Sequence, residues 1–151
     1  MKYLSYIQIN KDDLLRNLSI FKRLIDNKIC VVVKGNAYGH GLREICKILD
    51  GQVDYFQVDD YEELIELRRY TDTKALVLGY VQLDKLQKLQ SLNAVPGLYN
   101  AESINTYKGE YHLKIDTFLG RQGVLTSNLE NFLSKIKNKK NIGSLYSLCE
   151  H

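Results

Sequence analysis

Residues 31–41 read V-V-V-K-G-N-A-Y-G-H-G, a short apolar run that ends in Lys34 and passes directly into a glycine-rich turn. The β-branched run Val31–Val33 has the composition of a buried strand. No carboxylate flanks Lys34 in the sequence, and partial desolvation at a strand end can free a lysine amine as a nucleophile. Schiff-base chemistry requires such an amine. The alternative for an isolated V-V-V-K is a strand-end lysine that extends into solvent.

The turn that follows the lysine favours a binding site over this alternative. Gly39 and Gly41 allow the backbone to take positive φ or to approach a ligand closely. Asn36, Tyr38 and His40 bring hydrogen-bonding groups to the same loop. A nucleophilic amine and several polar groups are therefore expected to lie close together at one strand end.

The stretch resembles the pyridoxal-phosphate attachment motif of the alanine racemases, whose usual form has alanine where this chain has Gly35. The resemblance implies that Lys34 is the catalytic lysine, which binds pyridoxal 5'-phosphate as an internal aldimine. It also implies that Tyr38 is similar to the tyrosine that donates a hydrogen bond to the cofactor phosphate.

A second segment resembles the same family. Residues 112–123 read H-L-K-I-D-T-F-L-G-R-Q-G and look like the family block H-L-K-x-D-T-G-M-G-R-x-G. The resemblance implies that Arg121 contacts both the phenolic oxygen of the cofactor and the substrate carboxylate. It implies that Lys114 is similar to a lysine that is often carbamylated and supports this arginine. Phe118 and Leu119 replace the Gly-Met pair of the family.

Strand alternation within this segment predicts that His112, Lys114 and Asp116 share one face, with Leu113 and Ile115 on the other. Three polar side chains on one face are expected to point into a common interior. The alternative for Lys114 and Asp116 is an ordinary ion pair at a strand end.

The order of apolar runs along the chain predicts an α/β fold with parallel strands. Short apolar runs alternate with amphipathic segments, and the expected strands are 29–34, 54–58, 75–80, 94–99, 111–116 and 144–148. The family resembled here folds as an eight-stranded α/β barrel followed by a β-domain. We therefore expect an incomplete (β/α) TIM-type barrel of about six of the eight strands. Residues 1–151 would form one truncated cofactor-binding barrel domain, with the C-terminal β-domain absent. Residues 3–10 look like the family strand that packs on that β-domain.

Apolar stripes and capping residues predict the helices between these strands. Two capping boxes are expected, one formed by Asp60 with Glu63 and one by Ser127 with Glu130. Further helices are expected at 83–92 and 100–107. Two helical stripes precede them: Leu14, Leu18, Phe21 and Ile25 after Asn10, then Leu42, Ile45, Cys46 and Leu49 closed by Gly51.

Composition excludes some classes of protein. The chain has 151 residues, of which 44% are hydrophobic and 26% charged, as in ordinary globular proteins. A net charge of +3 is too small to indicate a nucleic-acid partner. No apolar stretch of about eighteen residues and no apolar signal core is present, so we expect a cytoplasmic protein with no membrane partner. The scattered cysteines and histidines predict no metal site.

The two motifs together imply the N-terminal barrel part of an alanine racemase, which interconverts L- and D-alanine with pyridoxal phosphate. In the family the second catalytic base is a tyrosine from the partner subunit's β-domain, so the parent is expected to be a homodimer and this chain alone to have little or no activity. Two alternatives stay open. One is a related racemase that acts on serine or on a broad range of amino acids. The other is a non-catalytic module that binds the cofactor through the lysine loop.

Overall fold

The computed structural model describes residues 5–138 and 140–145. Its strands form one parallel sheet in the order β1-β2-β3-β4-β5. β7 pairs with β5, and the short strand β6 pairs with the last two residues of β5. The strands are β1 (Cys30–Val32), β2 (Tyr55–Val58), β3 (Ala75–Val77), β4 (Ala94–Leu98), β5 (Tyr111–Asp116), β6 (Val124–Leu125) and β7 (Asn141–Leu145).

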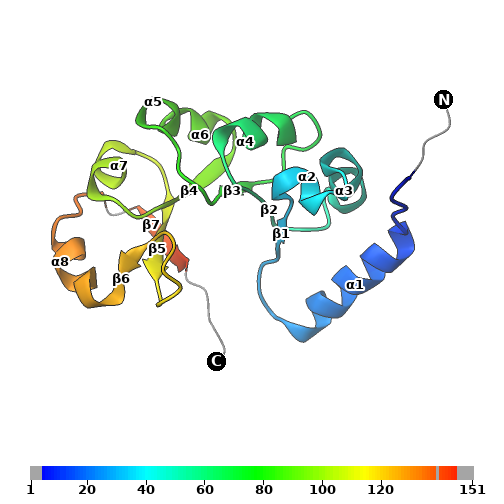
Figure 1. Ribbon diagram of the computed structural model, residues 1–151, viewed down its shortest axis with the longest axis horizontal. Helices are drawn as coiled ribbons and strands as arrows, with labels where there is room; N and C mark the ends of the chain where they lie inside the picture. The colour runs from blue at the N-terminus through cyan, green and yellow to red at the C-terminus, as the bar shows by residue number, and fades with distance from the viewer. Residues whose placement is uncertain (1–4, 139, 146–151) are drawn as a thin grey trace.

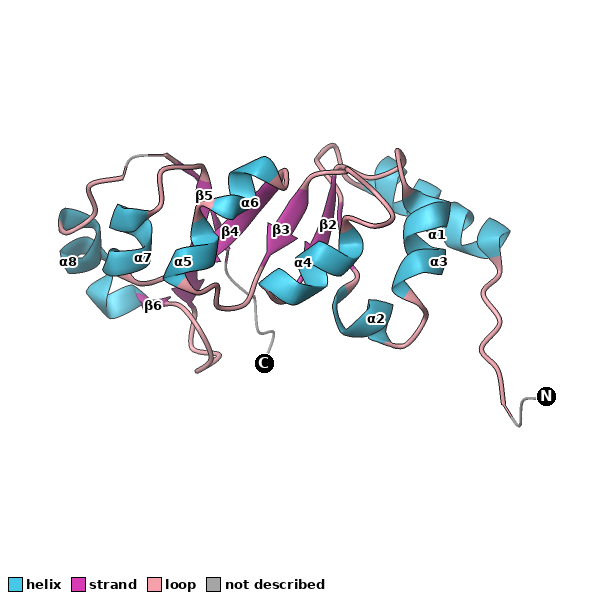
Figure 2. Ribbon diagram, turned by 90° about the horizontal axis from the view of Figure 1, so that it is seen from above, coloured by secondary structure: helices cyan, strands magenta, loops and turns pink. Residues whose placement is uncertain are grey.

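Helices follow the outer side of this sheet, as Figure 1 shows, where the strands form an arc. Figure 2 shows β2, β3 and β4 as neighbouring strands of similar inclination. The helices are α1 (Lys11–Leu24), α2 (Lys34–Tyr38), α3 (Leu42–Leu49), α4 (Tyr61–Leu67), α5 (Leu83–Leu86), α6 (Lys88–Ser91), α7 (Ala101–Thr106) and α8 (Leu129–Ser134). Within the described residues no strand pairs with the second edge of β1. The predicted incomplete α/β barrel is thereby confirmed.

The sequence located all of the described strands except β6, and some predicted strand ends differ from the observed ones. The strand at 111–116 has the predicted bounds, and the others differ by a few residues. β6 was not predicted, because two residues are too short for a periodic signal. β7 begins at Asn141, earlier than predicted, and residues 146–148 of the predicted strand lie outside the described residues. The predicted strand at 3–10 is wrong for the residues that the structure describes, because residues 5–10 form no strand.

The hydrophobic core lies between the outer face of the sheet and the helices. On β2, Phe56 and Val58 are fully buried, and Gln57 between them lines the inner side. The predicted stripe of α3 is confirmed, because Leu42, Ile45, Cys46 and Leu49 are all buried. The helix ends at Leu49 with Asp50 as its C-cap, and Gly51 follows with a φ of 70°, as expected for a glycine in left-handed conformation after a helix.

Helix α1 is present as predicted, but its apolar stripe is mostly in solvent. Asn10 caps the helix, since its side-chain oxygen accepts hydrogen bonds from the N–H groups of Asp12 and Asp13 at 3.0 and 3.3 Å. Of the stripe only Leu18 is buried, and Phe21 is 59% exposed. The stripe therefore predicted the helix correctly, but most of the stripe is not buried in the described structure.

The two expected capping boxes have different outcomes. Asp60 caps α4 by accepting a hydrogen bond from the N–H of Glu63 at 2.8 Å. The Glu63 carboxylate does not complete this box, because it accepts from Gly35 and Asp59 instead. The box at Ser127 is wrong, since Ser127 lies in a 3₁₀ turn (Thr126–Asn128) and α8 begins without a side-chain cap.

Helices of the described part of the chain are all too short or too polar to cross a bilayer.

The position of the core predicts very different costs for truncating two phenylalanines. Phe56→Ala removes a fully buried ring and is expected to lower the free energy of unfolding by about 3–5 kcal/mol. Phe21→Ala removes a ring that is 59% exposed and is expected to cost less than about 1 kcal/mol. Urea unfolding followed by circular dichroism measures both. Equal costs would contradict this placement of the core.

Candidate functional site

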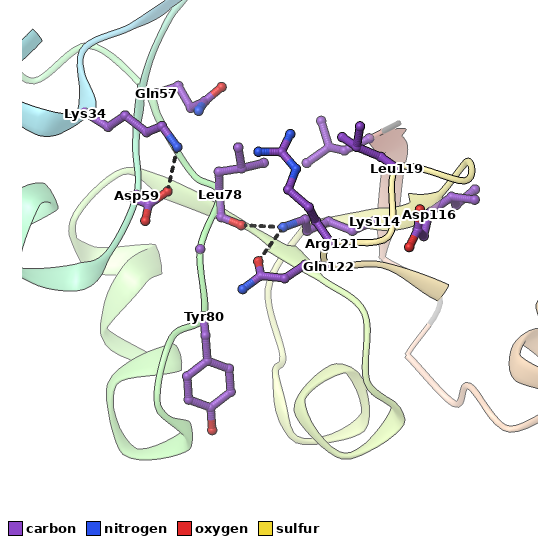
Figure 3. A pocket seen from close by; sticks show the side chains of 13 residues that line it. Lys34, Gln57, Asp59, Leu78, Tyr80, Lys114, Asp116, Leu119, Arg121 and Gln122 are labelled. Carbon is purple, nitrogen blue, oxygen red and sulfur yellow. Dashed lines mark hydrogen bonds and ion pairs between the residues drawn. The ribbon is translucent and has the colours of Figure 1, made fainter. Parts of the chain in front are cut away.

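A cavity of about 560 Å³ opens at the carboxyl ends of the strands. Its lining includes Lys34 two residues beyond β1, Asp59 directly after β2, and Lys114 on β5 (Figure 3). Parallel strands bring their carboxyl ends to one face of a barrel, which is where barrel proteins place their active sites. The predicted nucleophile therefore lies at the expected end of the fold.

The turn after Lys34 has an unusual backbone. Residues Gly35, Asn36, Ala37 and Tyr38 have φ values of 60°, 54°, 54° and 51°, so α2 is a short left-handed turn. This conformation costs roughly 1–2 kcal/mol for each residue that has a Cβ. Positive φ at Gly39 and Gly41 was anticipated, but the non-glycine residues before them were not. Strained backbone of this kind is concentrated at functional sites.

Hydrogen bonds within the loop stabilise this turn. The N–H of Ala37 donates to the carbonyl of Val33 at 2.7 Å, and the Asn36 side chain accepts from the N–H of Leu42 at 2.7 Å. The ring nitrogen Nδ1 of His40 lies 2.9 Å from the Ala37 carbonyl. The side chains of Asn36 and His40 thus stabilise the loop through hydrogen bonds, and neither lines the cavity. Tyr38 is 65% exposed and also lies outside the cavity lining.

Lys34 has a carboxylate partner that its flanking sequence does not contain. Its Nζ lies 3.0 Å from Oδ1 of Asp59, and its side chain is 27% exposed. The parallel register pairs Val32 with Gln57, so the residues two positions further along each strand lie side by side. The flanking sequence of Lys34 did not indicate this partner, because Asp59 lies 25 positions away in the sequence.

Gly79 allows the end of β3 to approach the end of β2. Its N–H donates to the carbonyl of Asp59 at 2.6 Å, and a Cβ at this position would overlap that carbonyl. Only glycine fits this position without a shift of the backbone. The Lys34 partner is therefore held by a contact from a third strand end.

Lys114 is buried in the inner side of the barrel, where it is 8% exposed. Its Nζ donates to the carbonyl of Leu78 at 2.9 Å and to Oε1 of Gln122 at 2.8 Å, as the dashed lines of Figure 3 show. These contacts replace the ion pair with Asp116 that was the alternative interpretation. Gly97 leaves room for the lysine stem, because a Cβ there would lie 3.2 Å from it.

The charge of Lys114 is disfavoured by its surroundings. Burial lowers the pKa of Lys114 below its ordinary value of 10.5. The positive charges of Arg121 and Lys34 lower this pKa further, and the carboxylate of Asp59 opposes them. The cavity therefore concentrates positive charge around an amine that loses its proton more readily than an exposed lysine does.

The segment after β5 brings Arg121 to the cavity. Asp116 is 8% exposed and lines the cavity, and its Oδ1 accepts from the N–H of Gly120 at 3.1 Å. In Figure 3 the Arg121 side chain extends from this loop toward the side that carries Lys34. The contact expected between Lys114 and Arg121 is taken by Gln122, whose amide accepts from Lys114.

His112 differs from the other two polar residues of β5. It is half-buried, its Nδ1 has no hydrogen-bond partner, and it does not line the cavity. Burial lowers its pKa, and the charge of Lys74 lowers it further. Lys114 and Asp116 therefore reach the expected interior cavity, but His112 lies outside it.

Sequence reasoning missed Asp59 and Gln122, which line the cavity, and Glu63, which accepts hydrogen bonds from two strand ends beside it. Asp59 directly follows a predicted strand, so the ends of parallel strands gave a signal that it could face Lys34. Glu63 was interpreted only as part of a capping box. Gln122 occupies a variable position of its motif, and no pattern marked it.

The fold and the cavity define a parallel α/β barrel that presents a lysine amine, a second lysine and an arginine at the carboxyl ends of its strands. The model of the alanine racemase N-terminal domain family matches residues 9–151. The chain therefore belongs to the alanine racemase N-terminal domain family.

Individual relatives agree with this assignment. The chain is similar to alanine racemase 2 of Caldanaerobacter subterraneus subsp. tengcongensis, with 35% identity over 130 residues, covering 78% of this chain and 34% of the relative. Its identity to the alanine racemase of Carboxydothermus hydrogenoformans is 33%, covering 89% of this chain and 40% of the relative. A structure of alanine racemase from Clostridium difficile 630 in complex with cycloserine has a TM-score of 0.77 and 27% identity, covering 92% of this chain and 43% of that one. The chain thus spans less than half the length of these relatives.

The lowered pKa of Lys114 predicts a pH dependence of stability. In the unfolded chain Lys114 keeps its proton up to higher pH, so between the two pKa values the unfolded state binds more protons. The contribution of Lys114 to the free energy of unfolding therefore rises with pH up to about 10.5 and is constant above it. Lys114→Met removes this contribution. Urea unfolding from pH 7 to 11 should show the wild-type minus variant difference increasing with pH, and a flat or falling difference would contradict it.

The loop before Arg121 contains a strained residue that can be relieved. Phe118 has a φ of 71° and is 89% exposed, at the position where the family block has glycine. Phe118→Gly is expected to raise the free energy of unfolding by about 0.5–1 kcal/mol, because glycine adopts this φ without strain. Phe118→Ala is the control, because it removes the ring but keeps the strain. Thermal unfolding measures both, and an equal effect of the two substitutions would contradict strain as the cause.

Proposed function

We propose that Lys34 binds pyridoxal 5'-phosphate and that residues 1–151 form the cofactor-binding barrel domain of an alanine racemase. The observation that carries the proposal is the position of the Lys34 amine, which lines the strand-end cavity together with Arg121 and Lys114. Membership of the alanine racemase N-terminal domain family supports it.

The residues around the cavity fit this cofactor chemically. Pyridoxal phosphate offers an aldehyde to an amine, and its phosphate and phenolic oxygen carry negative charge. The cavity supplies the Lys34 amine for the aldehyde and the Arg121 guanidinium for the negative groups. When bound, the cofactor accepts the electron pair left at the substrate Cα after proton removal.

Lys34 serves two purposes in this proposal. Its Nζ would leave Asp59, lose a proton to solvent and hold the cofactor by condensing with the aldehyde, with loss of water. Once a substrate amine had displaced it, the Nζ would move a proton to or from the substrate Cα on one face. The short distance between Lys34 and Asp59 orients the amine before either step.

Other residues have supporting roles in the proposal. The guanidinium of Arg121 binds the phenolic oxygen of the cofactor and the substrate carboxylate. Lys114 supports this region, and its lowered pKa favours the neutral amine that reacts with carbon dioxide to form a carbamate. Tyr38, exposed on the turn that follows Lys34, would donate a hydrogen bond from its hydroxyl to the cofactor phosphate.

The proposed substrate is alanine, and the proposed parent is a homodimer in which the partner subunit supplies the second base. Serine or a broad range of amino acids is the alternative substrate. A module that captures the cofactor through Lys34 without turnover is a second candidate function, because the Lys34 amine lines the cavity whether or not a second base is present.

Covalent labelling tests the proposed lysine. The protein is incubated with pyridoxal phosphate and reduced with borohydride, and peptide mass spectrometry then locates the adduct. We expect selective labelling of Lys34, no adduct at this position in Lys34→Ala, and weaker labelling in Arg121→Ala. Lys85→Ala is a matched control, because Lys85 is 24% exposed and pairs with Glu62 as Lys34 does with Asp59.

Two results separate the candidates. Labelling spread over surface lysines, or retained selective capture of the cofactor in Lys34→Ala, would contradict the assignment of Lys34. If Lys34 is labelled, incubation with L-alanine and with L-serine, followed by chiral chromatography, tests turnover. Racemisation of alanine supports the enzyme, whereas selective labelling without turnover is expected both for the barrel part of a racemase on its own and for the module.

A further inference from the structure

We propose that Glu63 is a positioning residue that holds Lys34 and Asp59 in place for cofactor binding. The proposal rests on the proposed role of Lys34. Oε1 of Glu63 accepts a hydrogen bond from the N–H of Gly35 at 2.7 Å, and Oε2 accepts from the N–H of Asp59 at 2.8 Å. Gly35 follows Lys34 in the chain, and Asp59 is the ion-pair partner of Lys34. One carboxylate therefore joins the two strand ends that carry this pair.

The backbone of both strand ends needs these acceptors. The left-handed turn satisfies the N–H of Ala37 through Val33 and that of Gly39 through Gly35. The N–H of Gly35 precedes these bonds and donates to Glu63 instead. Asp59 lies beyond the last residue of β2, and its N–H also donates to Glu63. Hydrogen bonds to a carboxylate are stronger than bonds between neutral groups.

The helix that carries Glu63 is firmly placed. The N–H of Glu63 donates to Asp60, which caps the start of α4, and the next residue, Leu64, is fully buried. Leu67, at the end of the same helix, is also fully buried. The carboxylate therefore extends from a rigid element to two strand ends whose backbone is less regular. This arrangement suits a group that fixes the direction of a neighbouring side chain.

Glu63 acts through the backbone and not on the ligand. It does not line the cavity that contains Lys34; it lines a second cavity of about 400 Å³, together with Asn36 and Tyr70. It therefore has no position from which to touch the reacting atoms. Its influence on cofactor capture passes through Gly35 and Asp59.

Two measurements on three variants test this role. Glu63→Gln keeps the shape but places an amide N–H₂ against a backbone donor, and Glu63→Ala removes both acceptors. Glu62→Gln is the control, because Glu62 lies beside Glu63 on α4 but pairs with Lys85. Amide hydrogen exchange by NMR reports the Gly35 and Asp59 N–H groups. Cofactor labelling with borohydride reports the fraction of adduct at Lys34.

In Glu63→Ala we expect exchange at Gly35 and Asp59 to accelerate at least about tenfold, with core amides of β3 unchanged. In Glu63→Gln we expect one of the two amides to accelerate. The share of label at Lys34 should fall several-fold in both variants, and Glu62→Gln should match the wild type. Circular dichroism confirms that each variant is folded.

The outcomes separate this inference from the proposed function. Absence of selective Lys34 labelling in the wild type overturns the proposed function and, with it, the positioning role. If the wild type is labelled and both Glu63 variants are labelled equally well, only the positioning role is overturned, even if the two amides exchange faster. Unchanged exchange at Gly35 and Asp59 in Glu63→Ala overturns the hydrogen bonds themselves.

Discussion

The parallel pairing of β1 with β2 is the constraint on which the site depends. Its register sets Val32 opposite Gln57, which brings Lys34 and Asp59 to the same level two residues further along. The same pairing places Gly35 and the N–H of Asp59 within reach of Glu63 on α4. A shift of one residue in this register would turn Lys34 to the helix side of the sheet. The nucleophile therefore has its place because of a strand pairing and not because of its own loop alone.

Strain and electrostatics in the site follow from this arrangement. The left-handed turn after Lys34 is unfavourable for Asn36, Ala37 and Tyr38, and hydrogen bonds on both of its sides offset the cost. Inside the barrel, Lys114 donates hydrogen bonds to a carbonyl and an amide oxygen. Its burial, together with the positive charges of Arg121 and Lys34, lowers its pKa. The cavity therefore combines excess positive charge with the amine of Lys34. Both features suit the proposed binding of a negatively charged aldehyde.

Much of the fold could be predicted from the sequence because its signals are local. Alternating apolar residues marked β5 with its observed bounds, and the stripe of α3 is buried as expected. The stripe of α1 predicted a helix correctly but not its exposure, since burial depends on what packs against the helix. The two-residue strand β6 has no periodicity to detect. The Glu63 carboxylate left the expected capping box because two donors from other strand ends compete for it.

The sequence by itself determined the family, the lysine at the end of the first strand, and the order of strands and helices, because motifs and periodicity are properties of neighbouring residues. Only the tertiary structure decided the partners of those residues. Asp59 is distant in sequence from its partner Lys34, and Glu63 is distant from its partner Gly35. Gln122, the partner of Lys114, lies at an unmarked position of its motif. Their contacts arise because strand pairing and helix packing bring the chain segments together, and no local pattern encodes the resulting distances.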